Sequence, residues 1–267
     1  MTYFELLKAA SLRIRRADAI ELLSFVTELS AAELVRDYGE VCADSAATAL
    51  EPLIIRAEHD EPAAYITGKR EFRGLTFQVT PDVLIPRSDS EPLVDAAVRS
   101  AQTRGGGEIT ILDLCCGSGC LGLAAIAKLP GASLIAIDIS DKALAVTRRN
   151  AETLGLAERL TLIQADALSV WENTDFEADI LISNPPYVTA SEMSALDRSV
   201  RDYEPHLALF GGTDGLDFYR ALAENIPRLL APDGVLILEC GSTQKSAVEA
   251  ITAGISNCVI IPAGTQL

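Results

Sequence analysis

The sequence is poor in metal-binding side chains. It contains two histidines, His59 and His206, and none of its six cysteines forms a C-x-x-C pair. A structural zinc site needs closely spaced Cys and His ligands, so this pattern excludes such a site and we expect no bound metal. Cys115, Cys116 and Cys120 cluster around one glycine loop, but they have no basic partner nearby. We therefore expect these thiols to pack rather than to act as nucleophiles.

Long apolar runs and an excess of basic residues are also absent. Residues 1–16 lack the apolar segment of a secretion signal, and no run of about 18 apolar residues occurs, so we expect a cytoplasmic protein without membrane contact. The formal net charge is −16, from 22 Lys and Arg against 38 Asp and Glu. Neither residues 1–80 nor residues 81–267 are basic. An acidic surface repels nucleic-acid phosphate and favours a basic macromolecular partner.

The composition fits a folded chain with a sizeable core. Of 267 residues, 49% are hydrophobic and 22% are charged, which suits a soluble protein with one large domain and a small one. Apolar residues recur at helical spacing through residues 1–60, and Ser30-Ala31-Ala32-Glu33 has the form of a capping box. Residues 45–58 continue this pattern, with Pro52 expected in a first helical turn. We predict a helical domain over residues 1–68.

Residues 69–87 have a different pattern. Phe72, Leu75 and Phe77 suggest two strands around an Arg73-Gly74 turn, which predicts a β-hairpin linker. The following segment, Ser88-Asp89-Ser90-Glu91, has the form of a second capping box, and an apolar stripe after it predicts a helix. Gly105-Gly106-Gly107 then breaks the chain.

Residues 88–267 alternate between apolar strands and helices. The predicted strands are 109–114, 133–139, 160–164, 180–183, 235–238 and 258–261. The predicted helices start at Cys120 and Asp141 and cover residues 216–230 and 244–253. Continuous apolar strands alternating with helices are typical of a parallel sheet that is covered on both faces. We predict an α/β fold with a Rossmann-like, doubly wound, mostly parallel sheet over residues 88–267.

A glycine loop follows the first of these strands. In Asp113-Leu114-Cys115-Cys116-Gly117-Ser118-Gly119 the glycines allow a ligand to approach the backbone closely. Asp138 ends the second strand, where a carboxylate can accept both hydroxyls of a ribose. Gly117-x-Gly119-x-x-Gly122 also satisfies the dinucleotide pattern, so the loop alone fits either a dinucleotide or S-adenosylmethionine. Asp113 favours the second ligand, because a carboxylate there suits an ammonium better than a pyrophosphate.

A second loop, Asn184-Pro185-Pro186-Tyr187, follows the strand that ends at Ser183. The two prolines fix two φ angles and remove two backbone donors, so the loop is a preset group of acceptors. Asn184 adds a side-chain carbonyl, and Tyr187 adds a flat face. Loops at the carboxyl ends of parallel strands carry chemistry. The pattern favours a planar NH2 group as the guest, although a Pro-Pro loop is also compatible with a merely rigid exit from a strand.

Together these segments resemble the class I S-adenosylmethionine-dependent methyltransferases, and more closely the protein-glutamine N5-methyltransferases that modify peptide chain release factors. The resemblance covers roughly residues 20–255. It rests on Glu61-Pro62, Tyr65-Ile66-Thr67-Gly68, Phe72, Leu84-Ile85-Pro86-Arg87, Asp113–Gly119, Asn184–Tyr187, Tyr203-Glu204-Pro205 and Gly211–Leu216.

The resemblance implies a function and a set of site residues. The enzyme would transfer a methyl group from S-adenosylmethionine to the glutamine of the Gly-Gly-Gln motif of release factors. The cofactor site would contain Asp113, Cys115, Cys116, Gly117, Ser118, Gly119, Asp138, Asp166, Ala167 and Asn184. Asn184, Pro185, Pro186 and Tyr187 would hold the substrate glutamine and carry the catalysis, the helical residues 1–68 would recognise the substrate, and we expect a monomer without direct contact to nucleic acid.

The chain departs from the family pattern at three places. Ser88-Asp89-Ser90-Glu91 replaces a Pro-Glu-Thr-Glu type of sequence, although the capping residues are kept. Ala167 stands where a larger side chain often packs near adenine, which predicts somewhat weaker cofactor binding. After Pro262 the sequence has no basic Gly-Arg segment, and we expect the sheet to lack an edge strand.

Two other enzyme classes and one binding protein remain as alternatives. A nucleic-acid amino-methyltransferase uses the same Asn-Pro-Pro-Tyr loop, but it needs a basic groove that the charge of −16 disfavours. A glutamine methyltransferase of a ribosomal protein is harder to separate by sequence. A non-catalytic binding module is suggested by the altered carboxyl end and opposed by the intact Asn184–Tyr187 loop.

Overall fold

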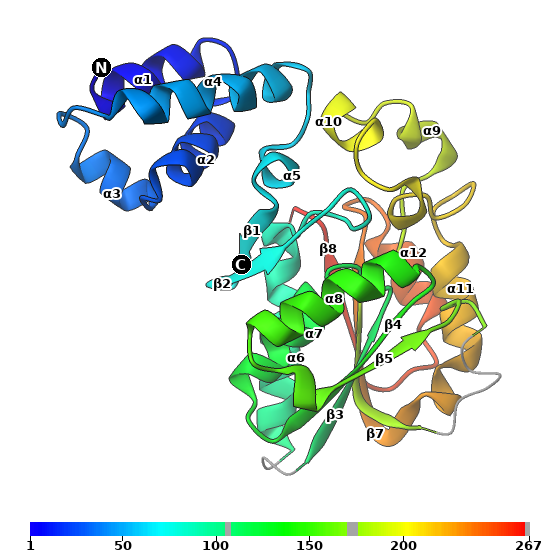
Figure 1. Cartoon of the computed structure of the whole chain (residues 1–267). Helices are drawn as coiled ribbons and strands as arrows, with labels where there is room; N and C mark the ends of the chain where they lie inside the picture. Colours follow the sequence, from blue (N-terminus) through cyan, green and yellow to red (C-terminus); the bar gives the residue numbers. More distant parts are fainter. Residues whose placement is uncertain (105–107, 170–175, 265–267) are drawn as a thin grey trace. The chain divides into compact units, whose positions relative to one another are not determined.

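The computed structural model describes residues 1–104, 108–169 and 176–264, and the chain divides into two compact units (Figure 1). The first unit contains residues 1–69 and 197–203, and the second contains residues 70–196 and 204–267. The predicted break at Gly105–Gly107 lies outside the described residues. The same holds for residues 265–267, the end of the segment in which the sequence departs from the family pattern.

The first unit is helical. Its helices are α1 (Tyr3–Ser11), α2 (Arg16–Thr27), α3 (Ala31–Arg36), α4 (Asp44–Glu58), α5 (Ala63–Thr67) and α10 (Arg198–Arg201). They enclose a core that includes Leu7, Leu22 and Leu50, each almost completely buried. The capping box predicted at Ser30 is confirmed, because the Ser30 hydroxyl accepts from the Glu33 N–H and the Glu33 carboxylate accepts from the Ser30 N–H.

Two features of this unit differ from the local sequence pattern. Pro52 lies inside α4 rather than in a first turn, because the helix begins eight residues earlier at Asp44. In addition, α10 comes from a distant part of the sequence. It joins this unit through an ion pair of Arg198 with Asp60, at 3.1 Å, and through a hydrogen bond from the Tyr203 hydroxyl to the His59 carbonyl, at 2.8 Å.

The second unit is an α/β structure. Its strands are β1 (Lys69–Phe72), β2 (Leu75–Gln78), β3 (Ile109–Leu114), β4 (Ala132–Asp138), β5 (Leu160–Gln164), β6 (Ala178–Ser183), β7 (Leu230–Cys240) and β8 (Cys258–Pro262). Its α-helices are α6 (Glu91–Thr103), α7 (Cys120–Lys128), α8 (Asp141–Thr153), α9 (Ala190–Met193), α11 (Asp217–Asn225) and α12 (Lys245–Ile251). Four short 3-10 helices of the described residues lie between them: η1 (Ser88–Ser90), η2 (Ala157–Arg159), η4 (His206–Ala208) and η5 (Ile226–Arg228). Strands β1 and β2 form the predicted hairpin, and the other six form one sheet in the order β5-β4-β3-β6-β7-β8.

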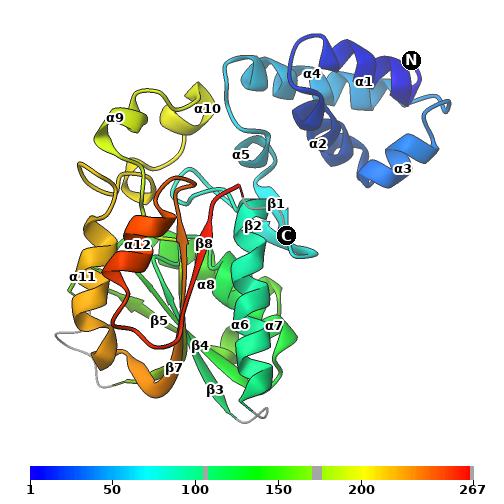
Figure 2. The ribbon, with the colours of Figure 1, turned by 180° about the vertical axis from the view of Figure 1, so that it is seen from behind.

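The six-stranded sheet is parallel and covered on both faces, which confirms the predicted fold class. Neighbouring residues of one strand enter different cores: Ile111 packs with α6 and α7, whereas Leu112 packs with α11 and α12. Figure 2 shows α6 and α7 on one side of the sheet and α11 and α12 on the other. This alternation follows from the period of two in a strand, and it explains why the strands read as continuous apolar runs.

Most predicted elements agree with the structure, with three adjustments. The helix predicted over residues 216–230 ends at Asn225 and continues only as the short η5, and β7 starts at Leu230 rather than at residue 235. The predicted capping box at Ser88–Glu91 is wrong. Ser88, the expected N-cap residue, lies in η1, and α6 begins only at Glu91. The Glu91 carboxylate accepts from the Arg73 N–H. Ser90, which directly precedes α6, makes no side-chain cap, and its hydroxyl donates to the buried Glu239 carboxylate.

The carboxyl ends of the central strands meet in one line. Leu114 of β3 pairs with Ile137 of β4 on one side and with Ser183 of β6 on the other. The chain passes from β3 to β4 and β5 in one direction and then returns to β6 on the other side of β3. The carboxyl ends of the neighbouring strands β3 and β6 therefore mark the topological switch point of the sheet. Ligands of open parallel sheets bind beside this point. Among the helices of the described residues, none is both long and apolar enough to span a membrane.

Candidate functional site

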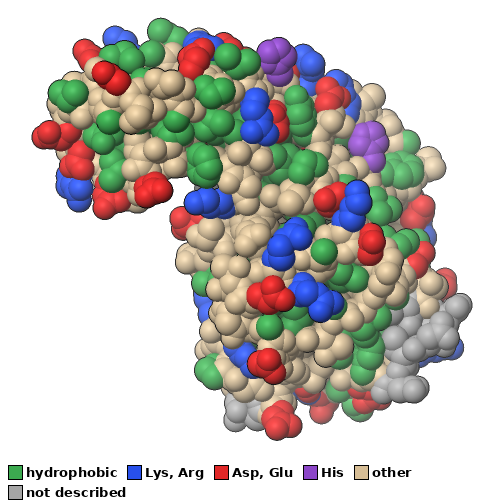
Figure 3. All heavy atoms as spheres, in the orientation of Figure 1, with side chains coloured by type: hydrophobic (Ala, Val, Ile, Leu, Met, Phe, Trp, Pro, Cys, Tyr) green, Lys and Arg blue, Asp and Glu red, His purple; other side chains and the backbone are tan. Residues whose placement is uncertain are grey.

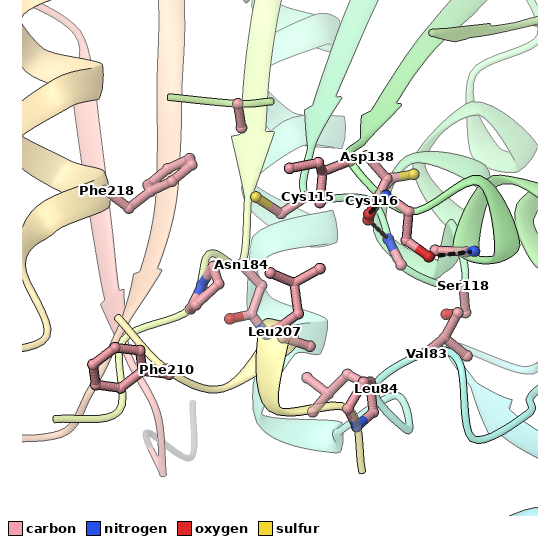
Figure 4. Close-up of a pocket in the computed structure, with 18 of the residues that line it drawn as sticks. Val83, Leu84, Cys115, Cys116, Ser118, Asp138, Asn184, Leu207, Phe210 and Phe218 are labelled. Atoms are coloured by element: carbon pink, nitrogen blue, oxygen red, sulfur yellow. Dashed lines mark hydrogen bonds between the residues drawn. The ribbon is translucent and has the colours of Figure 1, made fainter. Parts of the chain in front are cut away.

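A cavity of about 480 Å³ opens beyond the carboxyl ends of β3, β4 and β6. This volume is in the range of sites for small molecules. Its wall contains nine of the residues that the sequence analysis assigned to a site: Cys115, Cys116, Gly117, Ser118, Asp138, Asp166, Ala167, Asn184 and Pro186. Figure 4 shows Cys115, Cys116, Ser118 and Asp138 on one side of the cavity and Asn184 with Phe210 and Phe218 on the other.

Four other predicted site residues lie behind this wall. They are Asp113, Gly119, Pro185 and Tyr187. Asp113 and Gly119 are buried beneath the glycine loop, and Pro185 is buried in the second loop. Asp113 shares the sheet face of Ile111, since side chains alternate along β3, and this face is covered by α7. The sequence therefore located the loops correctly but did not show which of their side chains reach the cavity.

The glycine loop is held in a tight turn between β3 and α7. Gly119 has a φ of +75°, and a Cβ atom there would lie 2.6 Å from the Thr147 Cγ2. The Thr147 hydroxyl donates to the Gly117 carbonyl, and the Asn150 side chain donates to the Ser118 carbonyl. Because α8 supplies both side chains, the shape of this loop is fixed before any ligand binds.

Cys115 has an unusual backbone conformation in this loop. Its φ is +60°, in the left-handed region that normally favours glycine. Burial raises the pKa of Cys115 and of Cys116, and the carboxylates of Asp113 and Asp138 add to this rise. Both thiols are therefore protonated near neutral pH, which is unfavourable for a nucleophile. These two cysteines form part of the cavity wall in the thiol form.

Asp113 is a buried carboxyl with one satisfied oxygen. Its Oδ2 accepts from the Gly122 N–H at 2.9 Å, whereas Oδ1 is buried and has no hydrogen-bond partner among the described residues. Burial raises the pKa of Asp113 to about 7, and the neighbouring Asp138 also raises it. A positive charge at the surface of the loop would stabilise the ionised form of this carboxyl.

Asp138 presents its carboxylate to the cavity from the end of β4. One oxygen accepts from the Gly117 N–H and the other from the Ser140 N–H, both at 2.9 Å. These bonds fix the orientation of the side chain. A carboxylate has about four lone-pair positions, so each oxygen can accept one more hydrogen bond from a hydroxyl. Burial raises the pKa of Asp138, and the two backbone hydrogen bonds oppose this effect.

The wall continues beyond β5 with Asp166 and Ala167. Asp166 is exposed, and its Oδ1 accepts from the Leu168 N–H at 2.9 Å, whereas Ala167 is 7% exposed. A carboxylate above a small apolar surface can accept from an amino group of a planar ring while the methyl group of the alanine packs against the ring. At this end of the cavity an acceptor therefore lies beside a small apolar surface.

The Asn184–Tyr187 loop reaches the cavity from the other side of the switch point. The Asn184 Nδ2 donates to the Ser90 hydroxyl at 3.2 Å, and the Tyr187 hydroxyl donates to Glu239 at 3.3 Å. The Gln244 side chain donates to the Tyr187 carbonyl at 3.0 Å. The flat face of Tyr187 packs against the apolar core around Leu238 instead of lining the cavity.

Close backbone packing supports the same loop from a third direction. A Cβ atom at Gly211 would lie 2.5 Å from the Pro186 carbonyl oxygen. The Val188 N–H donates to the Leu209 carbonyl, and the Gly211 N–H donates to the Val188 carbonyl. Only glycine permits this approach, which explains the glycine at position 211.

An ion pair joins two of the sequence segments on which the family resemblance rests. Arg87 pairs with Glu204, whose side chain is 1% exposed. Glu204 also accepts from the Ile85 N–H at 3.2 Å. Arg87 and Pro205 both line the cavity. The ion pair between Arg87 and Glu204 therefore joins two segments of the cavity wall that are 117 residues apart in the sequence.

Sequence reasoning missed several residues of the site. No role was assigned to Ser90, which stands inside the expected capping box at Ser88–Glu91, or to Glu239 and Gln244. Leu207 and Phe210, which line the cavity although 60% and 48% of their surface is exposed, were also missed. One usable signal was present: Glu239 follows an unbroken apolar run in a buried strand, and a charged side chain there requires a partner.

Comparisons with known proteins agree with this architecture. Residues 98–211 match the methyltransferase small domain, and residues 3–68 match the PrmC N-terminal domain. A release factor glutamine methyltransferase of Cereibacter sphaeroides is 38% identical over 258 residues, which are 96% of this chain and 90% of the relative. The enzyme of the same name from Moorella thermoacetica is 39% identical over 249 residues, 93% of this chain and 86% of the relative.

A solved structure shows the same fold at lower sequence similarity. An S-adenosylmethionine-dependent methyltransferase from Agrobacterium tumefaciens has a TM-score of 0.51 and 15% sequence identity, with 72% of this chain and 59% of that chain covered. At this identity the likeness concerns the fold alone.

Proposed function

The chain belongs to the family of release factor glutamine methyltransferases, which are S-adenosylmethionine-dependent enzymes, and we propose that it methylates the side-chain nitrogen (N5) of the glutamine in the Gly-Gly-Gln motif of a peptide chain release factor. One observation carries this proposal. The acceptor loop Asn184–Tyr187, of which Asn184 and Pro186 line the cavity, and a wall suited to an adenosine meet at the switch point of the sheet.

The cavity wall has the groups that the cofactor requires. Asp138 offers acceptors to the ribose hydroxyls, and Asp166 with Ala167 offers an acceptor and an apolar surface to the adenine. Cys115, Cys116, Gly117 and Ser118 shape the intervening wall. Asp113 and Gly119 act from behind it: Gly119 permits the turn, and the unpartnered Asp113 oxygen places negative charge beneath the loop, which favours the ammonium of the methionine part.

The second loop suits an amide that must act as a nucleophile. An amide nitrogen is a poor nucleophile because its lone pair is delocalised into the carbonyl. When the Asn184 Oδ1 and the Pro185 carbonyl accept its two N–H groups, electron density is localised on the nitrogen and its lone pair is directed into the cavity. The bound cofactor supplies an electrophilic methyl group. The protein therefore contributes mainly by positioning and by electrostatic stabilisation.

The rest of the molecule supports a protein substrate. Residues 1–68 form a helical unit with its own core, and we propose that this unit recognises the release factor. Many arginines are already paired with carboxylates, among them Arg13, Arg56, Arg104 and Arg220, and in Figure 3 the basic side chains lie among acidic ones. Such a surface is unsuited to tracking phosphates. We propose a monomer that acts in the cytoplasm, where release factors work, without direct contact to nucleic acid.

The proposal is tested by transfer of labelled methyl groups. The purified protein is incubated with labelled S-adenosylmethionine and, in parallel, with a release factor, its Gln→Ala variant at the Gly-Gly-Gln motif, a ribosomal-protein fraction and DNA. We expect label on the wild-type release factor alone. Label on ribosomal protein or on DNA alone would instead identify a ribosomal-protein or a nucleic-acid methyltransferase.

A further inference from the structure

A buried carboxyl group lies next to the acceptor loop, at the end of β7. Glu239 is 2% exposed. Its Oε2 accepts from the Ser90 hydroxyl at 2.5 Å, and its Oε1 accepts from the Tyr187 hydroxyl at 3.3 Å. Burial of a carboxyl is costly unless its oxygens are hydrogen-bonded, so these two hydroxyls stabilise the group where it is.

The hydrogen bonds continue from Glu239 to Asn184. Ser90 has one hydroxyl hydrogen, and it lies within hydrogen-bond distance of both Glu239 and the Asn184 side chain. Burial raises the pKa of Glu239, and hydrogen bonds from Ser90, Tyr187 and Asn184 oppose this rise. In its ionised form the carboxylate can only accept, so Ser90 then donates to Glu239. Ser90 is then left with lone pairs only, and Asn184 must turn its NH2 group toward Ser90. The Asn184 carbonyl oxygen consequently takes the opposite position, on the side of the cavity.

We propose that Glu239 is a positioning residue which, through Ser90, determines that Asn184 presents its oxygen and not its NH2 group to the substrate. This inference rests on the proposed function, because only an amide or amine acceptor requires an oxygen at that place. The two hydrogen bonds also form a charge-assisted chain, which polarises the Asn184 amide and increases the negative charge on its oxygen.

The isosteric substitution Glu239→Gln separates this role from mere packing. A glutamine has almost the same volume, but one of its two terminal atoms is an NH2 donor. When that donor faces Ser90, the Ser90 hydroxyl is free to donate to Asn184, and the Asn184 amide rotates. The NH2 group of Asn184 would then face the NH2 group of the substrate glutamine, and neither could accept.

The backbone of the loop has separate support. Gln244 holds the Tyr187 carbonyl, and Gly211 packs directly against the Pro186 carbonyl. These two contacts do not involve Glu239, and Glu239→Gln keeps an oxygen that can accept from the Tyr187 hydroxyl. Glu239→Gln is therefore expected to alter the orientation of the Asn184 amide while the loop keeps its place.

The first test is single-turnover methyl transfer to the release factor at saturating cofactor. We expect Glu239→Gln and Ser90→Ala each to lower the rate constant roughly 10- to 100-fold, the scale of a misplaced polar contact. The Kd for S-adenosylmethionine and the KM for the release factor should change less than about twofold, because neither side chain is proposed to contribute to uniform binding. The double variant should be no slower than the slower single variant, since both changes interrupt the same chain of hydrogen bonds.

Thr252→Val is the matched control. Thr252 is also a buried polar residue, 3% exposed, and its hydroxyl donates to the Val248 carbonyl at 2.9 Å in α12, outside the cavity wall. The loss of this hydrogen bond should leave the single-turnover rate unchanged. An equal fall in rate for Thr252→Val and Glu239→Gln would overturn the proposed role.

The second test does not depend on the substrate. In a ¹⁵N-labelled protein the side-chain NH2 signals of Asn184, assigned by their loss in Asn184→Asp, should shift and exchange faster with water in Glu239→Gln and Ser90→Ala but not in Thr252→Val. If these signals move but the wild type methylates no release factor, the orientation is supported and the proposed function fails. A wild type that methylates the factor, with an unchanged rate and unchanged Asn184 signals in Glu239→Gln, would overturn the inference.

Discussion

The two loops that meet at the switch point are held in different ways. The loop from Asp113 to Gly119 is fixed by its own strand, by the helix that follows it and by the next helix, α8, through main-chain bonds and short side chains. The loop from Asn184 to Tyr187 is fixed by side chains from distant segments. These are Ser90 before α6, Glu239 near the end of β7 and Gln244 at the start of α12.

This difference separates binding from orientation. The first loop is a local structure that can hold a cofactor by shape, so damage to it should appear in cofactor affinity or in stability. The second loop depends on a network in which each group must donate or accept correctly, so damage to it should appear in turnover. The following substitutions test whether the two loops can be disturbed independently.

The largest effect is expected for Asp113, in the first loop. Burial raises its pKa from 3.8 to about 7. Folding raises the pKa of this carboxyl. While the group is protonated in both the folded and the unfolded state, its burial does not lower the free energy of unfolding through ionisation. As the pH rises above the unfolded pKa, the group ionises more readily in the unfolded state, and the folded state is destabilised until the pH exceeds the folded pKa. As the pH rises from about 4 to about 8, the free energy of unfolding of the wild type should fall relative to that of Asp113→Asn, by on the order of 4 kcal/mol.

Chemical denaturation of both proteins across this pH range, without cofactor, measures the effect. Asp113→Asn is its own matched control because it keeps the volume and the acceptor for the Gly122 N–H. A constant difference between the two proteins at all pH values would show that Asp113 does not titrate as a buried carboxyl.

The next effect concerns Asn184, in the second loop. Asn184→Ala should lower turnover by about 10²- to 10³-fold, the scale of one lost preorganised polar contact in a transition state. Cofactor affinity should remain close to that of the wild type. Steady-state kinetics and calorimetry measure the two quantities.

Asn225→Ala provides the comparison for Asn184→Ala. Asn225 ends α11, and its side chain donates to the Ala221 carbonyl at 2.8 Å, outside the cavity wall. The turnover of Asn225→Ala should equal that of the wild type. Comparable turnover in Asn184→Ala would remove Asn184 from the proposed role.

A smaller effect, in the first loop again, is expected for Asp138. Asp138→Ala should raise the Kd for S-adenosylmethionine by roughly 10- to 100-fold, because charge-assisted hydrogen bonds are each worth about 1.5–3 kcal/mol. The single-turnover rate at saturating cofactor should change much less. The exposed Asp141, in the first turn of α8, is a matched control, and an unchanged Kd in Asp138→Ala would exclude Asp138 from the ribose site.

The smallest effect concerns the backbone of the glycine loop. Cys115 has a φ of +60°, whereas the φ of Cys116 is not positive. A left-handed conformation costs an ordinary residue about 1–2 kcal/mol. Cys115→Gly removes this conformational strain, whereas Cys116→Gly removes none because Cys116 is not strained in this way. Thermal unfolding should therefore show that Cys116→Gly destabilises the protein more than Cys115→Gly, by roughly this amount. Equal effects would mean that the strain at Cys115 is absorbed elsewhere.

The sequence predicted what depends on neighbours along the chain. Strands β3 and β5 have the predicted bounds because each is a continuous apolar run with a clear end. The two loops lie at the carboxyl ends of β3 and β6 as expected, and nine of the assigned residues share one cavity. These features follow from periodicity, glycine and proline, all of which act over a few residues.

The sequence did not predict what depends on contacts between distant segments. Ser90 is only an inner position of the expected capping box at Ser88–Glu91, yet its hydroxyl donates to Glu239, which is 149 residues away in the sequence. The buried carboxyl needs this hydrogen bond. Asp113 and Tyr187 fit the pattern of site residues, yet they point away from the cavity because of the side-chain alternation in β3 and the packing of Tyr187 beside β7. Neither result can be obtained without the pairing of the strands.

The position of the transferred methyl group tests the account most directly. After reaction of the wild-type enzyme with a release factor, tandem mass spectrometry of the peptide that contains the Gly-Gly-Gln motif should find one methyl group on the side-chain nitrogen of the glutamine. The same peptide should be almost unmodified after an equal time with Asn184→Ala. A methyl group on any other atom, or equal modification by the variant, would contradict the assignment of the Asn184–Tyr187 loop as the acceptor site for the glutamine amide.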